Sequence, residues 1–197
     1  MISNKIDILG LNETWLNEDI SNSSLSIPGY QLERADLPDN VRKHGVAFYI
    51  RIDITYQRID SYIPNLIVVH LVLFNIYLIN VYRPPSNSAS DNENLIQFLN
   101  VFCTDKEVII QGDFNLASIK WGSSISLQDM QPLHRSYYDS FSALGLTQVV
   151  NESTIYPSGN FLYLFLLSHE DRFGGCMVLP PFHNRSHCPI LLNCFSI

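Results

Sequence analysis

The stretch Val108-Ile109-Ile110-Gln111-Gly112-Asp113-Phe114-Asn115 joins a short apolar run to a glycine, an acid and an amide. An apolar run of this length is typical of a buried β-strand, and Gly112 favours a turn at its end. Asp113 and Asn115 stand two residues apart on that turn, where both side chains can face one point. The plainer alternative is an Asx turn that only ends the strand. The stretch predicts a strand that delivers two polar side chains to one place.

A second apolar run, Ile6–Leu11, ends at Asn12-Glu13-Thr14-Trp15 and so places Glu13 at the carboxyl end of a strand. Strand ends are common positions for metal ligands and other functional groups. The alternative for Glu13 alone is a solvated loop acid.

Two further segments place polar side chains at strand ends. The first is Asn80-Val81-Tyr82-Arg83-Pro84-Pro85, where the prolines stiffen the exit from a strand and fix the direction of Tyr82 and Arg83. The second leads into the last strand, with His187 at its entrance. Taken alone, the first is an ordinary loop, and a lone histidine near a strand is more often structural than catalytic.

The rest of the chain reads as strands joined by loops, with few helices. Helices are expected at Glu93–Phe102, after a polar loop at Ser86–Asn92, and at Pro132–Leu144, where Gly145 provides a stop. A long loop, Leu116–Gln131, lies between them. The candidate strands are Ile6–Leu11, Val46–Ile52, Leu66–Leu73, Ile76–Val81, Val108–Gln111, Leu146–Val149, Leu162–Leu167 and Pro189–Asn193. Mixed strands with two or three helices fit an α+β domain of two packed sheets flanked by helices.

Composition limits the function classes. The 197 residues, 46% hydrophobic and 16% charged, suit one globular domain over residues 1–197. A net charge of −7 argues against a broad basic face for nucleic acid, but it permits a divalent cation in an acidic pocket. The apolar stretch Leu66–Val81 contains His70, Asn75 and Asn80 and is shorter than the ~20 residues that a membrane span requires. It is expected to form two strands that turn near Phe74-Asn75.

The four cysteines form no CxxC pair, and the opening residues show no secretory signal pattern. Reduced thiols in the nucleus or cytoplasm are therefore expected, without a membrane partner.

Four segments, taken together and in this order, resemble the endonuclease/exonuclease/phosphatase superfamily: Asn12-Glu13-Thr14-Trp15-Leu16, Tyr82-Arg83-Pro84-Pro85-Ser86, Gly112-Asp113-Phe114-Asn115 and Ser186-His187-Cys188-Pro189-Ile190. Three details are similar to the endonuclease domains of LINE-type non-LTR retrotransposons: Trp15 after the glutamate, the Tyr-Arg-Pro-Pro stretch, and Gly29-Tyr30 followed by Arg34 and Gly45-Val46. The resemblance covers nearly the whole chain. It implies a deoxyribonuclease-I-like, four-layer α/β/β/α sandwich and a monomeric hydrolase that nicks DNA.

The resemblance also implies a role for each residue. Glu13 would hold Mg²⁺ or Mn²⁺, hard cations that prefer carboxylate oxygen and water. Asp113 would take a proton from the attacking water, and Asn115 would orient that water or a phosphate oxygen. Tyr82 would place its phenol against the scissile phosphate, and His187 would donate a hydrogen bond to the charge that develops there. These five side chains are expected to converge at one end of the domain.

The chain departs from the family pattern at three points. Family members begin with a strand that carries an asparagine at the metal site, whereas this chain starts at what resembles the next strand. Tyr163 stands where an aspartate would orient the histidine, which would leave His187 without a fixed tautomer. Ser186 replaces a second acid. We therefore expect weak metal binding, reduced or absent turnover, and an exposed edge or a gap in one sheet, with lower stability and a tendency to aggregate.

Three functions remain open from the sequence. The first is a retrotransposon-derived endonuclease that is weakened or inactive, a pseudoenzyme in the second case. The second is a noncatalytic binding module on the same fold. The third is a phosphodiesterase that acts on a lipid or nucleotide phosphate, which would need other acids, such as Asp139, Glu170 or Asp171, to replace those missing at positions 163 and 186.

Overall fold

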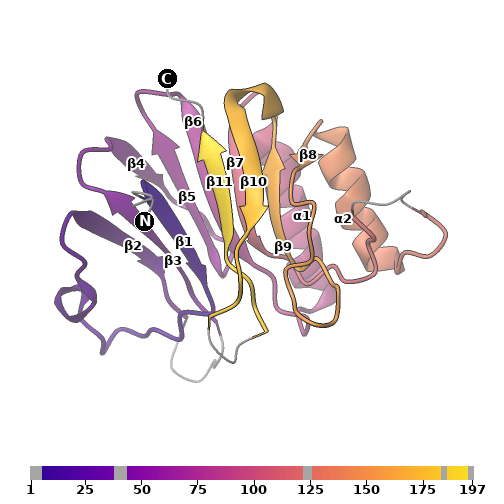
Figure 1. The fold of residues 1–197 in the computed structure, drawn as a ribbon, viewed down its shortest axis with the longest axis horizontal. Helices are drawn as coiled ribbons and strands as arrows, with labels where there is room; N and C mark the ends of the chain where they lie inside the picture. Colours follow the sequence, from indigo (N-terminus) through magenta and orange to yellow (C-terminus); the bar gives the residue numbers. More distant parts are fainter. Residues whose placement is uncertain (1–5, 38–43, 122–125, 183–185, 195–197) are drawn as a thin grey trace. The chain divides into compact units, whose positions relative to one another are not determined.

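A computed structural model describes residues 6–37, 44–121, 126–182 and 186–194. The chain forms two compact units, an N-terminal unit of residues 1–82 and a C-terminal unit of residues 83–197. Figure 1 colours them from indigo to yellow along the chain.

Within the N-terminal unit, the strands pair antiparallel in two groups (Figure 1). The first has the order β1-β3-β2, and its strands are β1 (Ile8–Asn12), β2 (Tyr30–Ala35) and β3 (Val46–Arg51). The second has the order β4-β5-β6, and its strands are β4 (Tyr56–Ile59), β5 (Leu66–Leu71) and β6 (Ile76–Tyr82). A short 3₁₀ helix, Asn22–Leu25, precedes β2.

The strands of this unit share an apolar core, within which a buried asparagine, Asn80, makes polar contacts. β3, β5 and β6 supply most of the buried apolar side chains, as expected for strands rich in β-branched and aromatic residues. Asn80 of β6 is fully buried, and its Nδ2 donates to the carbonyls of Leu11 (3.0 Å) and Ala47 (3.1 Å). Asn12 donates back to Asn80 Oδ1 (3.2 Å) and to the carbonyl of Val81 (2.9 Å). These bonds fix the end of β1, and with it the turn that carries Glu13.

Within the C-terminal unit, two helices lie beside the antiparallel strands β7, β9 and β8, of which β9 pairs with both others (Figure 1). A separate antiparallel pair, β10-β11, follows. The elements are α1 (Ala89–Cys103), β7 (Val108–Asp113), α2 (Pro132–Ala143), β8 (Thr147–Gln148), β9 (Tyr163–Leu167), a 3₁₀ helix (Glu170–Arg172), β10 (Phe173–Val178) and β11 (Ile190–Cys194). Phe114, at the end of β7, packs edge-on against Tyr137 and Phe141 of α2, with ring centroids 6.5 and 5.5 Å apart. The fold class is the expected α+β class.

All eight strands expected from the sequence are present, with boundaries shifted by up to two residues. The turn expected near Phe74-Asn75 also forms, and Asn75 takes a left-handed φ of 53°. The helix after residue 86 is longer than predicted. It begins at Ala89 because Ser88 and Asp91 form a capping box, so residues 89–92 belong to the helix and not to the loop. Residues 122–125 of the predicted long loop lie outside the described residues.

Three strands, β2, β4 and β10, were not predicted, because none has a continuous apolar run. β2 and β4 are bridged by polar side chains instead: Glu33 accepts from the Tyr56 hydroxyl (2.8 Å) and from Arg58 (3.3 Å). β10 contains two adjacent glycines and pairs with β11 through a register shift next to Gly175.

β1 lies at one end of its three-stranded sheet and pairs only with β3 within the N-terminal unit. The exposed edge or gap that the sequence led us to expect stays a prediction. Among the described residues, neither helix is both long and apolar enough to cross a bilayer.

Helix α2 carries a buried histidine, His134, whose protonation is expected to destabilise the C-terminal unit in acid. His134 Nδ1 lies 2.6 Å from the Ser118 hydroxyl and 3.3 Å from the Ser118 backbone N–H, so this nitrogen acts as an acceptor. Burial, and secondly the positive charge of Arg83, lower the pKa of His134. As the pH falls, His134 is therefore protonated in the unfolded chain before it is protonated in the folded chain. The free energy of unfolding that is present above pH ~6.5 is lost as the pH falls below that value.

We therefore expect the urea unfolding midpoint to fall between about pH 8 and pH 5.5, and to fall less in His134→Gln. The variant keeps an acceptor for Ser118 but removes the titrating group. Equal pH dependence in the parent and the variant would contradict this assignment.

Candidate active site

Glu13 lies on a strained turn directly after β1. Glu13 and Trp15 both have left-handed φ values, 53° and 55°, which cost free energy for residues other than glycine. The turn is held by backbone bonds from Thr14 N–H to the Gly45 carbonyl (3.2 Å) and from Trp15 N–H to the His44 carbonyl (2.9 Å). The carboxylate of Glu13 is therefore exposed to solvent at a fixed place.

Tyr82, the last residue of β6, reaches the same carboxylate. Its hydroxyl donates to Glu13 Oε1, and its backbone N–H donates to the Asn65 carbonyl (2.9 Å). The ring of His44 stands edge-on to the Tyr82 ring at 5.8 Å. The structure thus brings together Glu13 and Tyr82, which are 69 residues apart.

Asn65 and Gly45 lie next to Glu13 and Tyr82 and help to hold them in place. Asn65 was not predicted from the sequence to belong to this group. Asn65 Oδ1 accepts from Gly45 N–H (2.8 Å), and its Nδ2 lies 2.9 Å from His44 Nδ1. Gly45 has a φ of +91°, and a Cβ there would lie 2.5 Å from the Thr14 hydroxyl oxygen, so only glycine fits. A left-handed φ of 55° at Asn65 is a structural feature that the sequence did not reveal.

In the C-terminal unit, Asp113 and Asn115 form the turn that their spacing predicted. Asp113 is the last residue of β7 and only 3% exposed, and its Oδ1 accepts from Asn115 N–H (3.1 Å). The turn is therefore an Asx turn, in which the carboxylate of Asp113 bonds to the backbone of Asn115. Asn115 has a φ of 51°, a conformation that asparagine tolerates well.

Arg83 is the buried centre of this second group. The side chain is 2% exposed, its Nε donates to Asn92 Oδ1 (2.8 Å), and its Nη1 donates to the carbonyl of Phe114 (3.1 Å). In return, the Arg83 backbone donates to the Asp113 carbonyl (2.8 Å) and accepts from Asn115 Nδ2 (3.0 Å). Arg83 thus contacts every residue of the Asp113-Phe114-Asn115 turn through main-chain or side-chain groups.

Tyr137 closes the network around Arg83. Its hydroxyl donates to Asn92 Oδ1 (3.0 Å), and the Arg83 guanidinium lies over its ring, 5.5 Å from the centroid. Burial raises the pKa of Tyr137 to about 12, although the positive charge of Arg83 acts in the opposite direction. Tyr137 therefore stays protonated and acts as a donor at any ordinary pH.

His187 has a hydrogen-bonding partner, contrary to the prediction from the sequence. The Tyr163 hydroxyl lies within hydrogen-bonding distance of His187 Nδ1, and the two ring centroids are 5.7 Å apart. The prediction was wrong because it assumed that only a carboxylate could fill that position, whereas the phenol of Tyr163 is long enough to reach the ring.

Within each unit the predicted residues come together: Glu13 with Tyr82, and Asp113 with Asn115. His187 joins the second group through Tyr163, which stands directly opposite Asp113 in the β7–β9 register. The convergence of all five residues on one point stays a prediction.

The residues present allow only a minimal metal site. No group of three or more His, Cys, Asp or Glu side chains within the described ranges is arranged to hold a metal ion. Zn²⁺ would need such a group, whereas Mg²⁺ keeps several waters and binds through one or two carboxylates. The exposed Glu13 carboxylate fits that second requirement.

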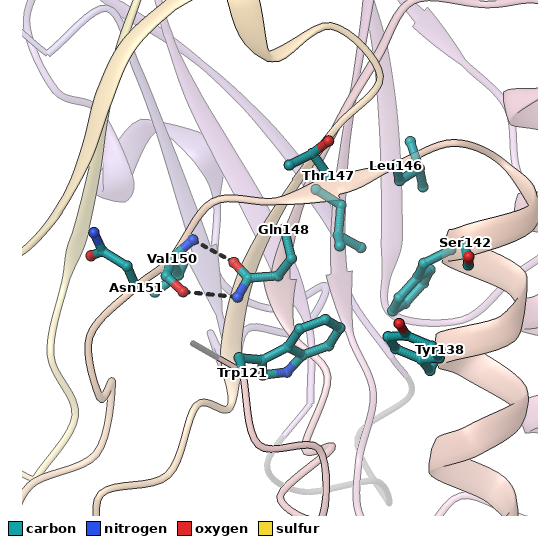
Figure 2. A pocket seen from close by; sticks show the side chains of 10 residues that line it. Trp121, Tyr138, Ser142, Leu146, Thr147, Gln148, Val150 and Asn151 are labelled. Atoms are coloured by element: carbon teal, nitrogen blue, oxygen red, sulfur yellow. Dashed lines mark hydrogen bonds between the residues drawn. The ribbon is translucent and has the colours of Figure 1, made fainter. Parts of the chain in front are cut away.

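A pocket of about 380 Å³ lies elsewhere in the C-terminal unit, between α2, β8 and the loop that carries Trp121 (Figure 2). Trp121, Tyr138 and Leu146 line it, and the side-chain amide of Gln148 is bonded to both backbone groups of Val150. None of the five predicted site residues lines this pocket.

Two solved structures share the fold. The AP endonuclease LMAP from Leishmania major matches with a TM-score of 0.75 and 16% identity, over 98% of this chain and 80% of that chain. The endonuclease domain of TRAS1, a telomere-specific non-LTR retrotransposon, matches with a TM-score of 0.66 and 15% identity, over 85% of this chain and 81% of that chain. At these identities the likeness establishes the fold, which is the expected deoxyribonuclease-I-like class.

The endonuclease–reverse transcriptase family matches residues 76–190, more than half of the sequence, and the chain belongs to that family. The match includes Tyr82, Asp113, Asn115 and His187. No curated protein matches the chain.

Proposed function

We propose that this chain is a metal-dependent phosphodiester hydrolase of the endonuclease type, derived from a retrotransposon, with cleavage of DNA weakened by the loss of two acids. The observation that carries the proposal is the Asp113–Asn115 turn. A buried acid and an amide are held side by side at a strand end by a buried arginine, which is more support than a structural Asx turn requires.

Each residue has a chemical role in this proposal. Asp113 accepts a proton from the attacking water, and Asn115 orients that water through its amide. Tyr82 orients Glu13 and presents its phenol to the phosphate, and His187 donates a hydrogen bond to the developing charge. Glu13 would hold Mg²⁺ or Mn²⁺, which would neutralise charge on the phosphate when bound.

The weakness of the activity follows from positions 163 and 186. A carboxylate in place of Tyr163 would stabilise a charged histidine, which a phenol does not do. Ser186 supplies no charge for binding a cation. A single carboxylate ligand implies weak affinity for the metal ion, so cleavage should need millimolar metal. We also propose that the protein acts on DNA as an intracellular monomer.

Nicking of supercoiled plasmid with Mg²⁺ and with Mn²⁺ tests the proposal. We expect slow nicking that EDTA stops and that Asp113→Ala abolishes, because that variant lacks the proton acceptor. Asp139→Ala is the matched control, since Asp139 is an exposed acid of α2 paired with Arg135 (2.7 Å).

Two outcomes of this assay bear on the functions that the sequence left open. Nicking that survives Asp113→Ala would point to a contaminating nuclease. No nicking by the parent, with DNA binding retained, would favour the noncatalytic binding module. A phosphodiesterase for lipid or nucleotide phosphates has no support from Asp139, whose carboxylate is engaged by Arg135 on the helix.

A further inference from the structure

Tyr163 and His187 are brought together by the backbone of the C-terminal unit. Tyr163 begins β9 and stands opposite Asp113 of β7, so both side chains project on the same face of the sheet. The hydroxyl of Tyr163 meets Nδ1 of His187, and the two rings are inclined at 53°.

Backbone hydrogen bonds hold both residues in place. His187 forms a β-bridge with Ile155, and the next residue, Cys188, donates to the Thr154 carbonyl (3.0 Å). The fully buried Thr154 also accepts from Tyr163 N–H through its hydroxyl (3.2 Å). Thr154 thus accepts hydrogen bonds from the backbone of Tyr163 and of Cys188, the residue after His187. The backbone of the unit therefore holds the phenol and the imidazole next to each other.

The chemistry of the two groups favours one arrangement of protons. A phenol can donate or accept, and a neutral imidazole has one nitrogen that donates and one that accepts. A phenol O–H is a stronger acid than an imidazole N–H, and the imidazole nitrogen is a stronger base than a phenol oxygen. The favoured hydrogen bond therefore runs from the Tyr163 hydroxyl to an unprotonated Nδ1 of His187.

We propose that Tyr163 is a positioning residue that keeps the proton of neutral His187 on Nε2, where the ring can donate to a phosphate. The consequence for cleavage rests on the proposed function, but the proton arrangement does not. An ionised carboxylate at this position would do the reverse, because it only accepts and so would hold the proton on Nδ1. Tyr163 thus retains the orientation of the ring and its donor without stabilising the charged imidazolium.

The proton position can be measured by ¹⁵N NMR of the histidine side chains, in the absence of metal and DNA. The pH should be about two units above the ordinary histidine value of ~6.5, so that neutral rings are observed. The signals of His187 are assigned by their loss in His187→Gln. We expect a single tautomer in the parent, with the proton on Nε2 and Nδ1 accepting a hydrogen bond.

Two variants complete the test. In Tyr163→Phe the Nδ1 shift should move toward that of a free nitrogen, since the ring remains but the donor is gone. In Tyr163→Asp the proton should move to Nδ1. A parent protonated on Nδ1, or a parent spectrum identical to that of Tyr163→Phe, would overturn the proposal.

Plasmid nicking gives the second readout. Tyr163→Phe should reduce nicking about 10-fold at unchanged fold, as judged by circular dichroism. If the parent does not nick DNA but the NMR result is as expected, the proposed function fails while the role of Tyr163 in orienting His187 stands. If the parent nicks and Tyr163→Phe nicks equally well, the positioning role in cleavage is wrong.

Discussion

Replacement of Arg83 with alanine is expected to destabilise the chain by roughly 3–5 kcal/mol and to abolish nicking. The side chain is 2% exposed and donates to Asn92 and to the Phe114 carbonyl. Its removal leaves these acceptors without a donor in a site from which water is excluded, and it also leaves a cavity against Tyr137. Each such loss costs more than the net contribution of an ordinary hydrogen bond.

The effect on nicking has the same origin. Asp113 and Asn115 are held in one turn by backbone and side-chain contacts with Arg83. Without the guanidinium, the carbonyls of residues 114 and 115 lose their shared donor, and the left-handed conformation of Asn115 is no longer secured. The acid and the amide then lose the alignment that proton transfer from water requires.

Urea denaturation measures the loss of stability in Arg83→Ala, and two further variants serve as its controls. Arg135→Ala removes an arginine from the exposed face of α2 in the same unit, where the ion pair with Asp139 contributes less than about 1 kcal/mol. Arg83→Lys keeps the charge but loses the planar fork, so its loss of stability should lie between the two. If Arg83→Ala costs no more than Arg135→Ala, the buried network does not support the site.

The sequence allowed the strand ends to be predicted because they depend on local patterns, whereas the catalytic roles of the residues placed there stay predictions. Apolar runs that stop at Glu13 and Asp113 identify strands and the polar groups that follow them, and the Asp113–Asn115 spacing predicts a turn. The structure retains all of these features. The turn was predictable because its residues are near in sequence, whereas the contact of Tyr82 with Glu13, 69 residues away, was implied only by the resemblance to the family.

The contacts that the sequence did not predict are between distant residues. Asn65 looks like an ordinary loop residue, yet it supports Gly45 and Tyr82. Asn92 reads as a polar residue before a helix, and it becomes a buried acceptor for Arg83 and Tyr137 only after the chain folds. β2 and β4 depend on the side chain of Glu33 in place of an apolar run. Contacts between residues that are far apart in the sequence leave no periodic pattern of apolar and polar residues, so they cannot be predicted from a local stretch.

The same limit explains the error about His187. Its partner was predicted from residue type, as an acid that is absent, whereas the register of β9 decides that the residue opposite Asp113 reaches the ring. The structure gives His187 a hydrogen-bonding partner, whereas the side chain at position 163 supplies no negative charge.

Restoring that charge should raise cleavage. The double variant Tyr163→Asp with Ser186→Asp is expected to nick plasmid about 10- to 100-fold faster than the parent. One change gives His187 a carboxylate that stabilises the imidazolium, and the other returns an acid for cation binding beside it. The loss of an orienting acid costs on the order of 10⁴ in rate in a serine protease triad, so the rescue would be partial.

Each single variant should gain much less than the double variant, because catalytic groups that act as a unit are strongly non-additive. Tyr163→Asp alone exchanges a donor for a carboxylate but adds no acid for the metal. Ser186→Asp alone leaves the phenol in place. Ser186 is exposed and its carbonyl accepts from Tyr156 N–H (2.9 Å), so an aspartate there should preserve the fold, which circular dichroism would verify. A folded double variant that nicks no faster than the parent would show that the two acids are not the decisive loss.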